Sequence, residues 1–191
     1  AANDSGDHVT VTLGVSDEPM SKTFKRDVNG QVVKEGAPQA SVKQGFGSIS
    51  FDSMPDFAGI VAELGNSSYL LYGGSLDDKK TTIGGRRKSL YPFQDRPSIM
   101  CGDYDAESDS EGKTPEELVA AYKKIFPNLD DFGYVVFTST SSHIYCDDER
   151  VYHRGNCKMY LKVESGTMIP GLLQRISDHS WLHGEGFIKL N

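Results

Sequence analysis

Apolar and polar residues alternate in short runs through the first fifty residues, which is the pattern of half-buried β-strands. The alternation is regular over residues 8–14, and residues 45–51 have the same character. Between them, Asn29 and Gly30 form a dipeptide typical of tight hairpin turns. The pattern predicts a small antiparallel β unit over residues 1–52.

After this unit the apolar residues recur every third or fourth position, which predicts helices. One helix is expected to begin after Ser53 and a second after Thr114. Thr114 is followed by a proline and, at the third position, by a glutamate, so it has the sequence of a capping box. A third helix is predicted over residues 170–179, and we expect the nearby Trp181 to be a core anchor.

Short apolar runs bounded by turn residues separate these helices and predict buried strands. They cover residues 68–72, 98–101, 134–138, 157–163 and 187–190. Residues 75–88 predict a loop, and residues 147–156 predict a polar hairpin or insertion. The expected class is α+β, with a mixed or mostly antiparallel sheet and flanking helices.

The chain has 191 residues, of which 37% are hydrophobic and 25% charged, as in an ordinary globular domain. No apolar run approaches the roughly 20 residues that a membrane helix needs. Residues 1–11 lack the basic and then apolar segments of a signal peptide. We therefore expect a cytoplasmic protein without a membrane partner.

The formal net charge of −7 limits any role in binding nucleic acid. Proteins dedicated to non-specific DNA binding are usually basic, so a DNA contact here would have to be local. Basic residues do cluster over residues 79–88, although such a cluster is also typical of a solvated loop.

An acidic pair, Asp103 and Asp105, follows the strand predicted over residues 98–101. In an extended chain these two side chains point to the same side, and Tyr104 between them points to the core. Carboxylate oxygens are the ligands that Mg²⁺ and Mn²⁺ prefer. Two such ions can activate a 3′ hydroxyl group and stabilise a leaving pyrophosphate. A solvated, acidic strand end is the alternative interpretation.

A second polar strand end lies at residues 138–143, where five hydroxyl side chains precede a histidine. Hydroxyl and imidazole groups suit the oxygens of a triphosphate. The two strand ends could lie at the same edge of the sheet and form one site.

These two segments resemble the first two motifs of the archaeo-eukaryotic primase superfamily, the primase–polymerases. The first motif is similar to Asp103-Tyr104-Asp105, and the second to Ser141-Ser142-His143. The surrounding sequence resembles the amino-terminal region of primase–helicase-like proteins from bacterial mobile elements and prophages. That similarity is carried by residues 22–33, 97–105, 169–173 and 181–188.

The resemblance implies a DNA primase–polymerase with a catalytic core over residues 53–191. Asp103 and Asp105 would hold two Mg²⁺ or Mn²⁺ ions, and Ser141 and His143 would bind the triphosphate. The implied partners are a DNA template with its primer, nucleoside triphosphates and a carboxy-terminal helicase domain. The third motif of the family, a single acidic residue, is expected beyond Asn191.

Two basic residues are further candidates from the resemblance. Lys158 stands where related sequences have a histidine at the start of a strand. Either His143 serves instead, or Lys158 contacts the triphosphate as a point charge, or the activity is altered. Arg87 lies upstream of the acidic pair, where related sequences also carry an arginine, and it could contact the triphosphate or the template.

A zinc site is a competing use of some of the same residues. His143, Cys146, His153 and Cys157 have side chains and spacings that could bind Zn²⁺ tetrahedrally. They lack paired Cys-x-x-Cys knuckles, so free cysteine thiols are the alternative. His143 could not bind zinc and a triphosphate together.

Two other functions use the same features. A non-catalytic module that binds nucleic acid would keep the primase-like shape and recruit a helicase to DNA, and Tyr145 and Tyr152 would be candidates for stacking on bases. A metal-dependent nuclease would use the same aspartates. The sequence has no motif of a P-loop ATPase, a serine hydrolase or a zinc protease.

Overall fold

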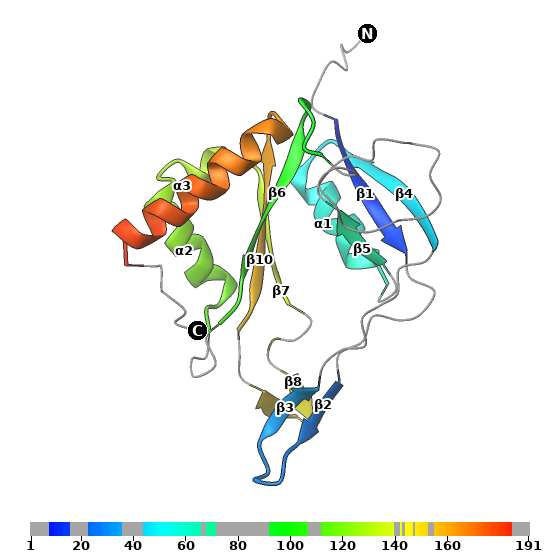
Figure 1. Cartoon of the computed structure of the whole chain (residues 1–191), viewed down its shortest axis with the longest axis vertical. Helices are drawn as coiled ribbons and strands as arrows, with labels where there is room; N and C mark the ends of the chain where they lie inside the picture. Colours follow the sequence, from blue (N-terminus) through cyan, green and yellow to red (C-terminus); the bar gives the residue numbers. More distant parts are fainter. Residues whose placement is uncertain are drawn as a thin grey trace.

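The computed structural model describes residues 8–15, 23–35, 44–65, 68–71, 92–106, 112–139, 142, 144–146, 148–152 and 155–184. Within this part the fold is α+β, as the sequence predicts, with antiparallel strand pairs and three α-helices (Figure 1). The loop predicted over residues 75–88 and the strand predicted over residues 187–190 lie outside the described residues.

The first sheet, called here the N-terminal sheet, is antiparallel. Its strands, in sheet order, are β4 (Gln44–Phe51), β1 (Val9–Val15) and β5 (Ser68–Leu71). The predicted alternation along β1 holds for Val9 and Val11, which are fully buried. It ends at Thr12, which is buried although polar, and Leu13 is only partly buried, because β1 lies between two other strands of the sheet. Helix α1 (Met54–Glu63) packs on this sheet, where the Phe57 ring lies 4.8 Å from the Phe51 ring.

The second sheet, called here the central sheet, has β10 in its middle. Its strands, in sheet order, are β6 (Ser98–Tyr104), β10 (Cys157–Val163) and β7 (Tyr134–Thr138). Both neighbours pair with β10 in the antiparallel direction. Strands β6 and β7 therefore run in the same direction and end at the same edge of the sheet, next to the start of β10.

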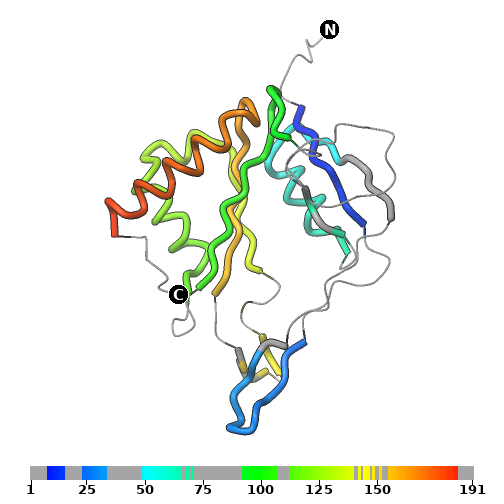
Figure 2. The backbone as a smooth tube through the Cα atoms, in the orientation of Figure 1, coloured from blue at the N-terminus to red at the C-terminus, as the bar shows by residue number. Residues whose placement is uncertain are grey.

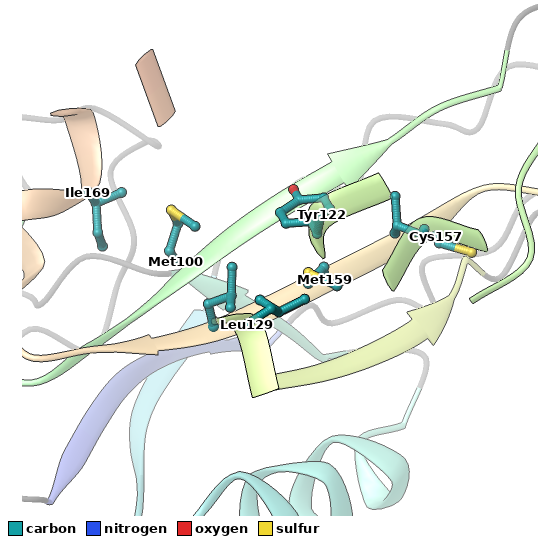
Figure 3. Close-up of a cluster of buried hydrophobic side chains, with 8 residues drawn as sticks. Met100, Tyr122, Leu129, Cys157, Met159 and Ile169 are labelled. Carbon is teal, nitrogen blue, oxygen red and sulfur yellow. The ribbon is translucent and has the colours of Figure 1, made fainter. Parts of the chain in front are cut away.

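The central sheet is covered on both faces, and its middle strand supplies both cores. Met159 and Leu161 face α2 and α3, where they pack with Met100, Leu118 and Leu129 (Figure 3). On the opposite face, Tyr160 packs with residues of the N-terminal sheet and α1. Figure 1 shows these two layers on either side of the central sheet.

The helices begin where the sequence predicts. The bounds of the other two are α2 (Pro115–Ile125) and α3 (Ile169–Leu182). The Ser53 hydroxyl oxygen accepts a hydrogen bond from the Asp56 amide at the start of α1. Before α2, Thr114 and Glu117 form both bonds of the predicted capping box. No helix in the described ranges has the length and apolar character needed to cross a membrane.

Two hairpins lie beyond the ends of the sheets and contact each other (Figure 2). Their strands are β2 (Thr23–Arg26), β3 (Val32–Glu35), β8 (Ile144–Cys146) and β9 (Glu149–Tyr152). The predicted Asn29-Gly30 turn joins β2 to β3, with Gly30 at a φ of 78°. The hairpin β8–β9 covers only part of the polar hairpin or insertion predicted over residues 147–156, because its first strand begins at Ile144 and its second ends at Tyr152.

The prediction for Trp181 is wrong, because 49% of this residue is exposed. The core-facing stripe of α3 is formed by Ile169, which is buried, and by Leu172 and Ile176, which are partly buried. At about 100° per residue, Trp181 lies about 140° around the helix from Ile176. It therefore points away from the core, although apolar Leu182 adjoins it.

Replacing Gly102 with alanine is expected to destabilise the protein by about 1–3 kcal/mol, because the new methyl group would overlap the buried phenol of Tyr122. Urea denaturation measures the change. The matched control is Gly59→Ala in α1, where a methyl group meets nothing within 4 Å, and it should stabilise the protein by about 0.5–1 kcal/mol. A Gly102→Ala variant as stable as the wild type would contradict this packing.

The raised pKa of Tyr122 predicts that the protein loses stability at alkaline pH. Burial, with a smaller contribution from Cys101, raises the pKa of Tyr122 from 10.0 to about 12. The stabilisation is complete below pH 10 and is lost as the pH rises towards 12, because the unfolded chain gives up its proton first. The part of the loss that is due to Tyr122 should reach about 3 kcal/mol near pH 12, so Tyr122→Phe should lose clearly less stability than the wild type. Urea denaturation at pH 9 and pH 11.5 tests this, and an equal loss in both proteins would contradict it.

Candidate functional site

Strand pairing brings Lys158 directly opposite Asp103. The two residues are register partners in β10 and β6, although 55 positions separate them in the sequence. The Lys158 ammonium donates a hydrogen bond to Asp103 Oδ2 at 2.9 Å. The side chains are 35% and 49% exposed, so solvent still reaches both charged groups. Two of the candidate residues thus meet at one point of the sheet.

Aromatic side chains lie beside the Asp103–Lys158 pair on the same face of the central sheet. Phe137 of β7 is the register partner of Lys158 on its other side, so the three side chains form one row across the sheet. The ring of Phe137 meets the ring of Tyr160 edge-on at 5.8 Å, and Tyr160 meets Phe57 of α1 at 5.3 Å. The row lies on the face of the central sheet that is turned towards α1.

The pKa of Lys158 shows the balance of forces at this point. Burial lowers this pKa, but the hydrogen bond to Asp103 and its charge outweigh burial, so the net shift is upward. The ammonium therefore stays protonated at neutral pH. Because both partners are partly exposed, the pair contributes only about 0–1 kcal/mol to stability. An ion or ligand of higher charge can displace such a contact.

Asp105 follows directly after β6 and is exposed. Tyr104 packs against the apolar cluster on the α2 face, which confirms its predicted direction. In the pleat of the strand, Asp103 points to the other face. The sequence predicts that the Asp105 side chain points to the same face as Asp103. Asp105 lies one residue beyond Tyr104, the last paired residue of β6, so the strand pairing does not fix the direction of its side chain.

The chain around this site is tied together by Asn156, which sequence reasoning did not identify as a candidate. Its side-chain oxygen accepts a hydrogen bond from the Ala106 amide at 2.8 Å. Its carbonyl oxygen accepts bonds from the Ser139 amide at 2.8 Å and the Ser142 hydroxyl at 2.7 Å, and its amide donates to the same hydroxyl at 2.9 Å. The segments that follow β6 and β7 are thereby held at the start of β10. The only sequence signal was its place in a Gly-Asn turn before a strand.

The same turn receives the chain that enters α2. Gly112 forms an isolated bridge with Gly155, and the Lys113 amide donates to the Gly155 carbonyl at 3.3 Å. Gly112 has a φ of 78°, and a methyl group there would overlap the Gly155 backbone. Both the conformation and the close approach therefore require glycine.

Several predicted residues lie outside the described part of the chain. These are Arg87, Ser141, His143 and His153. Ser142, between two of them, holds the Asn156 backbone. Asn156 thus bonds to both polar strand ends at one edge of the sheet, to Ala106 after β6 and to Ser139 and Ser142 after β7, and Ser142 is the middle residue of the predicted second motif.

The two cysteines of the proposed zinc set differ in surroundings. Cys157 is fully buried, and its thiol donates a hydrogen bond of 3.5 Å to the Lys113 carbonyl. Burial, and then the charge of Glu116, raises the pKa of Cys157, whereas zinc binds a thiolate. Cys146 is exposed. A buried, protonated thiol is a poor zinc ligand, so the surroundings of Cys157 argue against its place in the proposed zinc set.

The donor chemistry of Asp103 and Asp105 fits a hard divalent cation, which prefers carboxylate oxygens. The number of available oxygen ligands is smaller than the two carboxylates offer, because one oxygen of Asp103 already accepts a hydrogen bond from the Lys158 ammonium. Among the residues that the structure describes, no group of three or more histidine, cysteine or acidic side chains could hold a metal ion.

A cavity of about 660 Å³ lies on the other face of the central sheet. It is lined mainly by apolar residues, among them Met100 of β6, Leu161 of β10, Leu172 of α3 and Leu129, which follows α2. Because Asp103 and Lys158 point to the opposite face, this cavity is separate from the candidate site.

Comparison with known proteins gives no relative. No protein-family model, no curated protein and no solved structure matches the chain. The fold and site define an α+β domain that carries an acidic–basic pair at the end of a central antiparallel sheet.

The Asn156 side chain is expected to stabilise the site edge. Asn156→Ala leaves the Ala106 amide without its acceptor and should cost about 1–3 kcal/mol in urea denaturation, whereas Asn156→Asp keeps an acceptor oxygen and should cost less. The control is Asn128→Ala, in an exposed turn where the asparagine side chain makes no capping bond. Equal stability of the Asn156 and Asn128 alanine variants would contradict the role of this side chain.

Proposed function

We propose that this domain is a nucleotidyltransferase of the primase–polymerase type, with its reaction centre at the Asp103–Lys158 end of the central sheet. The observation that carries the proposal is the direct contact between these two residues. Asp103 belongs to the acidic motif, and Lys158 stands where sequences of the family that this chain resembles have a histidine. The two positions that the resemblance singles out are thus neighbours in the sheet.

Each residue has a role that follows from its charge and exposure. Asp103 and Asp105 present carboxylate oxygens at a solvent-accessible strand end. Lys158 is a protonated, half-exposed ammonium that can bind and orient phosphate oxygens. The rigid row of β6, β10 and β7 keeps these groups at fixed spacing, which favours an ordered approach of the reacting groups.

Mg²⁺ or Mn²⁺, held by Asp103 and Asp105, would supply charge stabilisation for the attacking hydroxyl and the leaving pyrophosphate. The substrates would be nucleoside triphosphates and a DNA template with its primer. A helicase domain would be the partner in a longer protein. Ser141, His143 and Arg87 remain candidates for further phosphate contacts.

A second candidate is a nucleic-acid-binding module without catalysis. It is favoured by the ion pair itself, since Lys158 neutralises part of the acidic charge that would attract metal ions. Such a module would bind DNA without divalent ions and would show no affinity for nucleotides.

Template-dependent nucleotide incorporation with Mn²⁺ tests the first proposal, in the longest natural protein that contains this chain. The Asp103→Asn/Asp105→Asn variant should lose incorporation by at least about 100-fold, because both oxygen donors for the cations are weakened. The control is Asp131→Asn, an exposed aspartate beside α2 on the other side of the sheet, which should keep wild-type incorporation.

Unchanged incorporation by the double variant would refute the assignment of the aspartates. Absence of incorporation from both proteins, together with metal-independent DNA binding, would favour the binding module. Degradation of labelled DNA without added nucleotide, lost in the double variant, would point instead to a nuclease.

A further inference from the structure

The contact between Lys158 and Asp103 has a consequence for the order in which ligands bind. The ammonium is at 2.9 Å from one carboxylate oxygen, which is where a cation bound to that oxygen would compete with it. In the part of the chain that the structure describes, the Asp103 carboxylate makes no other hydrogen bond or ion pair. Lys158 thus acts as the resident counter-ion of Asp103.

The strand pairing keeps Lys158 beside Asp103. Lys158 lies in the middle strand, paired on one side with Asp103 and on the other with Phe137. The phenyl group of Phe137 offers no hydrogen-bond acceptor oxygen, so Asp103 is the only carboxylate in this row of the sheet. With no other ligand present, the ammonium is expected to remain on Asp103.

A bound triphosphate changes this balance. Its oxygens carry several negative charges, and the flexible lysine stem allows the ammonium to turn from the carboxylate to the phosphates. Both groups are partly exposed, so the turn needs no change in the fold. The released carboxylate then becomes available to a divalent cation.

We propose that Lys158 couples the two ligands of the site, so that a divalent cation gains full access to Asp103 only after a triphosphate has drawn the ammonium away. This inference rests on the proposed function and concerns the regulation of the same site. Because coupling between two ligands is reciprocal, a cation on Asp103 also favours the turn of Lys158 towards the triphosphate. Lys158 is a positioning residue for the cation and a direct contact for the triphosphate.

Binding of Mn²⁺ alone, measured by isothermal titration calorimetry, tests the first half of the coupling. Lys158→Met should raise the affinity for Mn²⁺ by roughly 3- to 10-fold, because it removes both a competitor and a like charge. Lys158→Arg keeps the charge and should stay near the wild type. The matched control is Lys162→Met in the same strand, whose ammonium bonds to the Asp52 carbonyl and which should leave Mn²⁺ affinity unchanged.

The second half is tested with an exchange-inert cobalt(III) complex of ATP, which carries its own metal and takes up no Mn²⁺. At saturation, this complex should raise the Mn²⁺ affinity of the wild type towards that of Lys158→Met. The affinity of Lys158→Met for Mn²⁺ should change by less than about twofold, since its Asp103 is already free. Circular dichroism and a thermal melt confirm that each variant is folded.

Failure of this inference can be told apart from failure of the proposed function. If Asp103→Asn lowers Mn²⁺ affinity but Lys158→Met leaves it unchanged or lower, the coupling is refuted and the reaction centre stands. Equal gains of Mn²⁺ affinity with the cobalt complex in the wild type and in Lys158→Met would also refute the coupling. If Asp103→Asn changes neither Mn²⁺ binding nor incorporation, both the proposed function and the coupling are refuted.

Discussion

The pairing of β10 with both of its neighbours is the constraint on which the rest of this structure depends. Because β10 lies between β6 and β7, its alternate side chains enter two different cores. The same pairing sets Lys158 opposite Asp103, and it puts the ends of β6 and β7 at one edge. A slip of one residue in this register would exchange the two faces and would bury Lys158 among the apolar residues of α2 and α3.

Hydrogen bonds at the start of β10 extend this constraint to the surrounding loops. Asn156 uses backbone and side chain together to hold the segments after β6 and β7, and Gly155 receives the chain that leads to α2. The candidate site is therefore supported by a rigid strand and by a fixed turn. The charged groups themselves stay half-exposed, so a ligand can rearrange them while the scaffold remains in place.

Local signals predicted the scaffold well. The capping box at Thr114, the cap at Ser53 and the Asn29-Gly30 turn depend on residues a few positions apart, so their outcome is encoded in short segments. The burial of Val9 and Val11 and the direction of Tyr104 were also correct, because a strand has a simple period of two. Trp181 shows where such reasoning fails: apolar Leu182 beside it suggested burial, but the phase of α3 turns it to the solvent.

The sequence by itself determined the α+β class, the positions of most elements and the types of side chain available for chemistry. It named Asp103 and Lys158 as candidates from separate motifs, without a way to measure the distance between them. Only the tertiary structure decided that they are cross-strand partners and that Cys157 belongs to the core. The physical reason is that strand order and register arise from the packing of two cores over many residues, whereas each sequence motif records only its own segment.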